Sequence, residues 1–189
     1  MKKMKTLFIK DGSNSITAYI DMHNRWVFEK ETVARIKLDG TACAVIGGKL
    51  YKRYDCKLHK KTGKRKIPPE GWIPCQELPD PITGHWPGWV PVTSDDKYHL
   101  LAFNLRNKWE DGTYELIGEC INGNPQGING HMLVSHNTKK VYFQPDFSYG
   151  SMFCLLLNLD AEGLVFYGKD GQMCKLRRRD FGLEWPIKE

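Results

Sequence analysis

The first candidate for chemistry is Lys37, a charged residue inside an apolar run. Residues 34–48 read ARIKLDGTACAVIGG, and most of them are apolar or small. A cation beside packed side chains costs on the order of several kcal/mol unless a partner or a reaction uses it. In the tetrapeptide Lys37-Leu38-Asp39-Gly40, Lys37 is therefore either a nucleophile or an edge residue that pairs with Asp39.

Further charged residues follow this tetrapeptide in order along the chain. They are Arg53, Glu119 at the end of YELIGE, Glu162 at the start of EGLV, and the pair Lys175 and Arg177. Taken singly, Arg53 fits a basic hairpin, Glu119 a surface carboxylate after a strand, and Glu162 a turn. A deprotonated lysine is a nucleophile, and neighbouring cations both lower a lysine pKa and stabilise negative charge on a phosphate. These residue types are therefore compatible with phosphate chemistry.

Short apolar or alternating runs between turn residues must position these side chains. They indicate an α+β chain that consists mostly of antiparallel strands with a few short helices. Residues 164–176, LVFYGKDGQMCKL, are typical of a hairpin. Helices are expected at 148–158 and at 94–107, the second one with Ser94 as its cap.

Composition excludes several classes of protein. The chain has 189 residues, 41% of them hydrophobic, and it lacks a run of 18 apolar residues. The six cysteines lie more than ten residues apart, and His131 and His136 have no cysteine or acidic partner at zinc spacing. We therefore expect one globular domain over residues 1–189, a cytoplasmic location, no membrane segment and a monomer.

Two segments stand out from the rest of the chain. Residues 49–66 hold seven Lys and two Arg against one Asp, a net charge of +8 within a chain of +6. Such a stretch is typical either of a phosphate-binding surface or of a lysine-protected hairpin edge. Residues 67–92 hold seven of the ten prolines and three of the six tryptophans, so we expect a packed loop there and no central strand.

The ordered motifs resemble those of covalent nucleotidyltransferases, the superfamily of polynucleotide ligases and RNA capping enzymes. Three longer segments, PDPITGHWPGW, LIGE…NPQGINGH and EGLVFYGKDGQMCKLRRRDFGLEWP, are similar to the auto-adenylating 5′-to-3′ RNA ligases, or RNA ligase 1 family. The similarity runs from about Trp26 to Pro186. It implies a nucleotidyltransferase domain in which antiparallel sheets flank a nucleotide groove, without a C-terminal OB domain.

The resemblance also implies roles for the residues. Lys37, Glu119, Glu162 and Lys175 would be catalytic, with Lys37 attacking the α-phosphate of ATP, Glu119 accepting from a ribose hydroxyl and Glu162 holding Mg²⁺ or Mn²⁺. The nucleotide would contact the following residues: Ile36, Lys37, Asp39, Arg53, Glu119, Glu162, Lys175 and Arg177. RNA would contact the following basic residues: Lys52, Arg53, Lys57, Lys60, Lys61 and Lys64.

Some assignments stay open. Arg177 stands where the family usually has lysine, so it binds phosphate itself or shares that task with Arg178 or Arg179. The residue that stacks on adenine is not identifiable, and the candidates are Leu133, Phe143 and Phe147. Three tryptophans offer RNA bases a stacking platform, or else hold their loop on the core: Trp72, Trp86 and Trp89.

The implied function is ATP-dependent joining of 5′-phosphate and 3′-hydroxyl RNA ends through a lysyl-AMP intermediate. One alternative is a GTP-dependent guanylyltransferase, which would share the chemistry of Lys37 but normally has a further domain. Another is a non-catalytic RNA-binding module of the same fold, which would keep the basic segment without needing the four catalytic residues.

Overall fold

The computed structural model describes residues 4–12, 15–58, 62–138, 140–141 and 148–187. The chain divides into two compact units, Gly40–His136 and a second unit made of Met4–Asp39 with Asn137–Glu189. Both units combine mainly antiparallel sheets with few short helices, so the predicted α+β class is confirmed. Within the described ranges, no helix has the length and apolar character needed to cross a bilayer.

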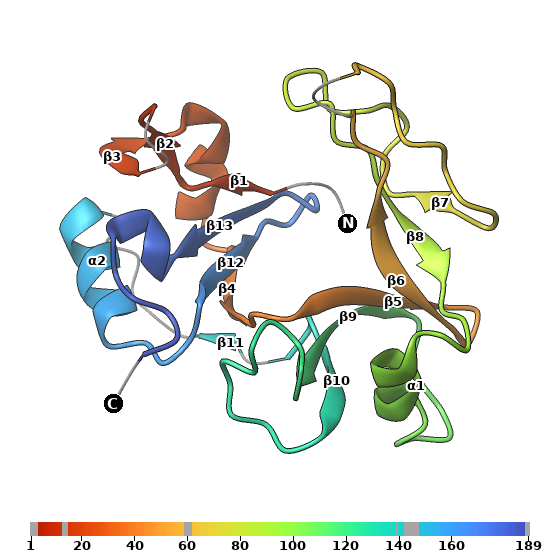
Figure 1. The fold of residues 1–189 in the computed structure, drawn as a ribbon. Coiled ribbons are helices and arrows are strands. Elements are labelled where there is room, and N and C mark those ends of the chain that lie inside the picture. Colours follow the sequence, from red (N-terminus) through yellow and green to blue (C-terminus); the bar gives the residue numbers. More distant parts are fainter. Residues whose placement is uncertain (1–3, 13–14, 59–61, 139, 142–147, 188–189) are drawn as a thin grey trace. The chain divides into compact units, whose positions relative to one another are not determined.

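The second unit is built on a five-stranded sheet in the order β1-β13-β12-β4-β11, with a separate β2–β3 hairpin (Figure 1). Only β1 and β13 run parallel in this sheet. Its elements are β1 (Lys5–Thr6), β2 (Phe8–Lys10), β3 (Ile16–Ile20), the 3-10 helix η1 (Met22–Phe28), β4 (Val33–Lys37), β11 (Lys140–Val141), α2 (Tyr149–Leu157), β12 (Gly163–Tyr167), β13 (Met173–Arg177) and the 3-10 helix η2 (Arg178–Phe181).

Strand alternation buries one face of this sheet. Ile36, Leu164 and Leu176 lie opposite one another on β4, β12 and β13, and Leu164 and Leu176 are fully buried. They pack in one cluster with Met152 and Leu156 of α2. The predicted helix at 148–158 is confirmed, and the Ser148 side chain caps it by accepting from Ser151 N at 3.2 Å.

The first unit is built on a six-stranded sheet in the order β10-β9-β5-β6-β8-β7. Its elements are β5 (Thr41–Ile46), β6 (Lys49–Asp55), β7 (Ile73–Pro74), β8 (Pro87–Pro91), α1 (Lys97–Phe103), β9 (Gly112–Gly118) and β10 (His131–Ser135). One face packs with α1 around a cluster that includes Cys43, Leu116 and Leu133. The expected helix at 94–107 is shorter than predicted, and its cap is Asp96 rather than Ser94.

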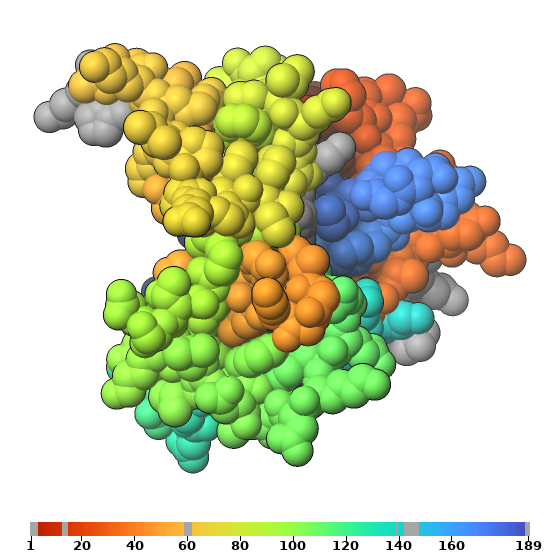
Figure 2. Space-filling view, turned by 90° about the vertical axis from the view of Figure 1, so that its right-hand side faces the viewer, coloured from red at the N-terminus to blue at the C-terminus, as the bar shows by residue number. Residues whose placement is uncertain are grey.

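The segment rich in proline and tryptophan packs down only in part: residues 84–90 are half-buried or buried, whereas residues 67–71 and 81–83 are exposed. Figure 2 shows the segment in yellow to yellow-green. The expectation that it contains no central strand is wrong, because β8 pairs with β6 on one side and with β7 on the other. Prolines occupy only the two ends of β8, at Pro87 and Pro91. The strand interior, Gly88-Trp89-Val90, keeps its donors for the ladder.

Gly163 is the tightest point of the second unit's sheet. A Cβ placed on it would lie 2.1 Å from the Leu176 carbonyl oxygen and 2.7 Å from Arg177 Cα. We predict that Gly163→Ala lowers the free energy of unfolding by about 1–3 kcal/mol, because the backbone of β13 cannot move aside cheaply. Urea denaturation measures this change.

The matched control is Gly150→Ala in α2, where an added Cβ meets no atom within 4 Å. Alanine is the better helix former by up to about 1 kcal/mol, so this variant should be neutral or more stable. Equal destabilisation of both variants would contradict the close packing at Gly163.

Candidate active site

The residues predicted to act together belong to two units. Lys37, Asp39, Glu162, Lys175 and Arg177 lie in the second unit, whereas Arg53 and Glu119 lie in the first. We describe each set within its own unit.

The sheet of the second unit gathers cations on the face opposite its apolar core. Gly163 of β12 pairs with Lys37 on β4 and with Arg177 on β13, and two residues further along Val165 pairs with Arg35 and Lys175. Paired residues of an antiparallel sheet point to the same side. Gly163 itself adds no side chain to that face, because a Cβ there would clash with the β13 backbone.

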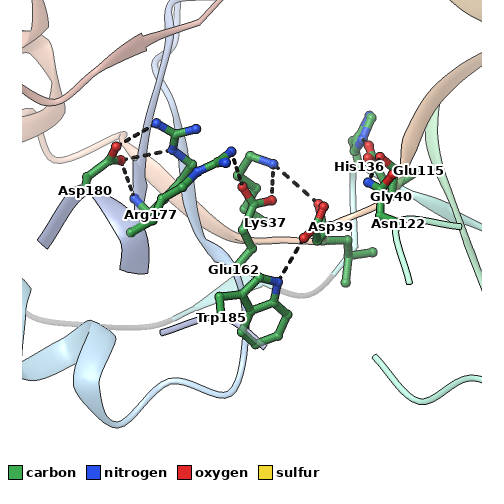
Figure 3. Close-up of polar contacts among 12 residues, drawn as sticks. Lys37, Asp39, Gly40, Glu115, Asn122, His136, Glu162, Arg177, Asp180 and Trp185 are labelled. Carbon is green, nitrogen blue, oxygen red and sulfur yellow. Dashed lines mark hydrogen bonds and ion pairs between the residues drawn. The ribbon is translucent and has the colours of Figure 1, made fainter. Parts of the chain in front are cut away.

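Glu162 connects two cations at the edge of this face. Its carboxylate is 4% exposed, accepts from Lys37 Nζ at one oxygen and lies 3.5 Å from Arg179 Nη2 at the other (Figure 3). A buried carboxylate is costly unless cations or donors satisfy it. Lys37 therefore has its charge partner, and that partner is Glu162 rather than the Asp39 considered from the sequence.

Lys175 is held differently from Lys37. Among the residues that the structure describes, none forms a hydrogen bond or ion pair with its ammonium group. Burial, followed by the charges of Arg177 and Lys37, lowers the pKa of Lys175 to about 8, although Asp180 and Glu162 act in the opposite direction. Strand β13 thus holds a lysine whose pKa is near neutral pH and whose ammonium group is available to an anion.

Arg177 is fixed by a two-pronged contact to Asp180. The Asp180 carboxylate is 2% exposed and accepts from Arg177 Nε at 3.1 Å and from Nη2 at 2.6 Å. Lys10 Nζ lies 3.8 Å from the same carboxylate. The Nε and Nη2 donors of Arg177 are therefore bonded to Asp180, and only its remaining N–H donors can bind a phosphate.

Arg178 has a structural task. It is 5% exposed, and its guanidinium donates to the carbonyl oxygens of Leu156, Leu159 and Glu184 at 2.5–3.1 Å. The first two carbonyls lie at the C-terminal end of α2, where helix carbonyls have no partner within the helix. Of the two arginines left open by the sequence, only Arg179 lies beside Glu162.

Asp39 is held by a residue near the end of the described chain. Trp185 Nε1 donates to Asp39 Oδ2 at 3.0 Å (Figure 3). The Ile36 side chain, by contrast, packs against the core, so it is the backbone of Ile36 that borders the cationic face. The Trp185 contact was missed from the sequence, although the similarity of the DFGLEWP segment marked that region.

Arg53 is partly buried on β6 of the first unit. Its guanidinium lies 5.3 Å from the Trp89 ring centroid and donates to Cys75 Sγ at 3.7 Å. Burial lowers the pKa of Arg53, while the nearby Cys75, Asp55 and Glu115 act against this. The side chain is thus an anchored cation and not a solvated member of the basic hairpin.

Glu119 is exposed directly after β9. Its carboxylate Oε1 accepts from Gly130 N at 3.2 Å, and its own backbone bonds to Gly130 and to the His131 ring. Earlier on β9, the buried Glu115 has its Oε2 2.9 Å from Nε2 of the half-buried His136, which follows β10. The sequence did not single out Glu115, because a carboxylate in an alternating strand has no distinguishing pattern.

The lysines predicted to contact RNA lie in different environments. Lys52 points to the α1 side of the sheet and pairs with Asp96 at 2.5 Å, away from Arg53 on the other face. Lys57 and Lys64 are exposed, and Lys60 and Lys61 lie outside the described residues. Of the lysines predicted to contact RNA, Lys57 and Lys64 are therefore accessible to solvent.

The aromatic candidates are used in packing. Trp72 and Trp86 meet edge to face at 4.8 Å between ring centroids, Trp86 Nε1 donates to Gln76 O at 2.9 Å, and Trp89 is buried. These contacts favour the reading that the tryptophans hold their loop. Leu133 belongs to the apolar core, and Phe143 and Phe147 lie outside the described residues.

A preformed metal cage is absent from the described ranges, where no three His, Cys, Asp or Glu side chains converge. Glu162 offers carboxylate oxygens, the donor type that Mg²⁺ prefers, but both already face cations, Lys37 and Arg179, which would have to move aside for a divalent ion to bind. Mg²⁺ is commonly held by one or two carboxylates together with substrate phosphates.

Comparison with known proteins gives consistent results. A family model described as RNA ligase 1 matches residues 99–189, which include Glu119, Glu162 and Lys175 but not Lys37. RNA ligase 1 of Mus musculus is 29% identical over 226 residues, covering 83% of this chain and 69% of the relative. The proteins of the same name from Pongo abelii and Danio rerio are 28% and 27% identical, each covering 81% of this chain and 68% of the relative.

Adjacent arginines should differ sharply in their effect on stability. We predict that Arg178→Met lowers the free energy of unfolding by about 2–4 kcal/mol, because buried carbonyls lose their charged donor. Arg179→Met, whose side chain is 67% exposed, should change it by no more than about 0.5 kcal/mol. Thermal and urea denaturation of both variants test this, and similar losses would show that Arg178 does not hold α2.

Lys175 should make stability depend on pH. Below about pH 8 its ammonium is charged in both states and its burial cost is fully present; between about pH 8 and 10 the folded state releases the proton first, so stability rises. Lys175→Met should therefore gain stability relative to wild type at pH 7, and the difference should shrink by on the order of 2 kcal/mol toward pH 10. Urea denaturation across this range measures it.

Lys169→Met is the control on the same hairpin, since Lys169 is exposed and pairs only loosely with Glu29 at 3.5 Å. Its difference from wild type should stay flat with pH. A flat difference for Lys175→Met as well would mean that the buried ammonium is not destabilising.

Proposed function

We propose that this chain, which the family model and the relatives support as a member of the RNA ligase 1 family, is an ATP-dependent RNA ligase. It would join a 5′-phosphate end to a 3′-hydroxyl end through an adenylated Lys37. The fold that we propose is the nucleotidyltransferase domain, with the 189 residues acting as one catalytic domain.

The observation that carries this proposal is the cationic face of the second unit. Lys37, Lys175 and Arg177 share one face of three paired strands, with Gly163 of β12 opposite both Lys37 and Arg177. A triphosphate placed there would meet an unpaired ammonium at Lys175 and a fixed guanidinium at Arg177. A purely structural strand gains nothing from an unpaired, partly buried lysine.

In the first step, Lys37 would lose its proton and its Nζ lone pair would attack the α-phosphorus of ATP. The new N–P bond replaces the bond to the pyrophosphate oxygen, and pyrophosphate leaves. The α-phosphate oxygens gain charge in this step, and Lys175 is the residue that we assign to stabilise it. Glu162 would keep the Lys37 amine oriented until the nucleotide arrives.

The later steps would return Lys37 to its starting form. The 5′-phosphate oxygen of the RNA attacks the lysyl phosphorus and takes the AMP, which regenerates the amine. The 3′-hydroxyl then attacks the RNA 5′-phosphorus, an RNA phosphodiester forms and AMP leaves. Lys57 and Lys64 are exposed on the basic segment and would contact the RNA backbone.

Glu162 would hold Mg²⁺ or Mn²⁺ together with phosphate oxygens of the substrate. When bound, such an ion neutralises charge on the phosphates. In the first unit, Arg53 would contact the nucleotide sugar and Glu119 a ribose hydroxyl.

The decisive experiment is the intact mass of the protein after incubation with ATP and Mg²⁺. We predict that wild type gains the mass of one AMP, after pyrophosphate treatment has first removed any AMP acquired during expression. Lys37→Arg should gain none, because a guanidinium stays charged and cannot attack, although it still pairs with Glu162. This variant thus separates loss of the nucleophile from loss of the ion pair.

Three controls distinguish the alternatives. GTP in place of ATP should leave the wild-type mass unchanged, and a GMP adduct would favour a guanylyltransferase. An adenylated protein should then seal 5′-phosphate and 3′-hydroxyl RNA ends. RNA binding without any nucleotide adduct would overturn the ligase proposal and favour a binding module.

A further inference from the structure

Glu119 and the segment Ile128-Asn129-Gly130-His131 form one bonded unit at the edge of the first unit's sheet. Glu119 N donates to Gly130 O at 2.9 Å, and Gly130 N donates back to the Glu119 carboxylate Oε1 at 3.2 Å. A third contact joins the His131 ring Nε2 to the Glu119 backbone oxygen at 2.6 Å. Because a carbonyl oxygen only accepts, His131 must carry its proton on Nε2.

The His131 ring is itself fixed. It stacks on the Tyr98 ring of α1 with centroids 4.5 Å apart and an angle of 13° between the planes. Helix α1, the Glu119 turn and the start of β10 are thereby connected through one imidazole.

The backbone permits this close approach only with glycine at position 118. Gly118 has φ 131°, lies opposite His131 in the strand register, and a Cβ there would lie 2.0 Å from Gly130 O. The turn is closed further along by Asn124, whose side-chain amide donates to Ile128 O and accepts from Ile128 N, both at 3.0 Å. The geometry is more constrained than an exposed loop requires.

One carboxylate oxygen of Glu119 is bound to Gly130, and the carboxylate as a whole is exposed. Its orientation therefore depends on where Gly130 and His131 hold the backbone. A carboxylate with one oxygen fixed directs the other in a defined direction, which suits a site that must recognise a single hydroxyl.

We propose that His131 is a positioning residue that, through its bonds to the Glu119 backbone, makes the site selective for nucleotides that carry a ribose over those that carry a deoxyribose. This inference rests on the proposed function, in which Glu119 contacts a ribose hydroxyl. His131 itself touches no substrate in this assignment, and it acts only through Glu119.

The test compares adenylation of the protein by ATP, 2′-deoxyATP and 3′-deoxyATP, with kcat/KM of adduct formation for each. Wild type should prefer ATP to at least one deoxy analogue. His131→Phe keeps an aromatic ring for Tyr98 and loses the N–H donor. Its preference for ATP should therefore fall about tenfold, because adduct formation with ATP becomes slower while adduct formation with the deoxy analogue does not. His131→Gln supplies an amide N–H at similar reach and should recover most of the preference.

A neighbouring control comes from Met132→Leu, an exposed position of the same strand, which should keep the wild-type preference. If His131→Phe does not fold, His131→Met removes the donor without a ring. A purely structural role would lower all three rates equally and leave the ratios unchanged, which would overturn the inference. Adenylation of wild type without any preference would also overturn it, whereas no adduct with ATP at all would overturn the proposed function itself.

Discussion

The antiparallel register of β4, β12 and β13 is the constraint on which the charged face of the second unit depends. Gly163 lies opposite both Lys37 and Arg177, and Leu164 opposite Ile36 and Leu176. A shift by one residue would turn the cations into the core and the leucines outward. The apolar packing against α2 therefore also determines where the charges lie.

Three consecutive arginines, identical in residue type, differ in burial and in the groups that they contact. The Arg177 side chain is 13% exposed and lies against Asp180, Arg178 is buried among backbone carbonyls, and Arg179 is mostly exposed beside Glu162. A buried guanidinium needs acceptors in its plane, and the end of α2 provides them for Arg178. Each arginine thus has a different neighbour and a different contribution to stability.

Sequence reasoning succeeded where a local pattern carries the information. Periodicity predicted the helix at 148–158, and turn residues predicted the hairpin of β12 and β13. It failed where the outcome depends on contacts between distant segments, as for Trp185 with Asp39 or Lys52 with Asp96. The proposed roles of Lys37, Glu119, Glu162 and Lys175 came from the family resemblance, while the contacts of these residues came only from the fold.

The second unit is made of two separate stretches of chain, and this bears on the order in which the protein folds during synthesis. Strands β1 and β4 find their described partners only in β13, β12 and β11, all beyond residue 139. The described residues of the first unit, in contrast, lie within one stretch of chain, Gly40–His136, so their contacts can form earlier. During synthesis on the ribosome, the strand that carries Lys37 therefore has no pairing partner until about a hundred more residues have been added. Contacts that close a loop of this length are among the slower ones to form in the chain.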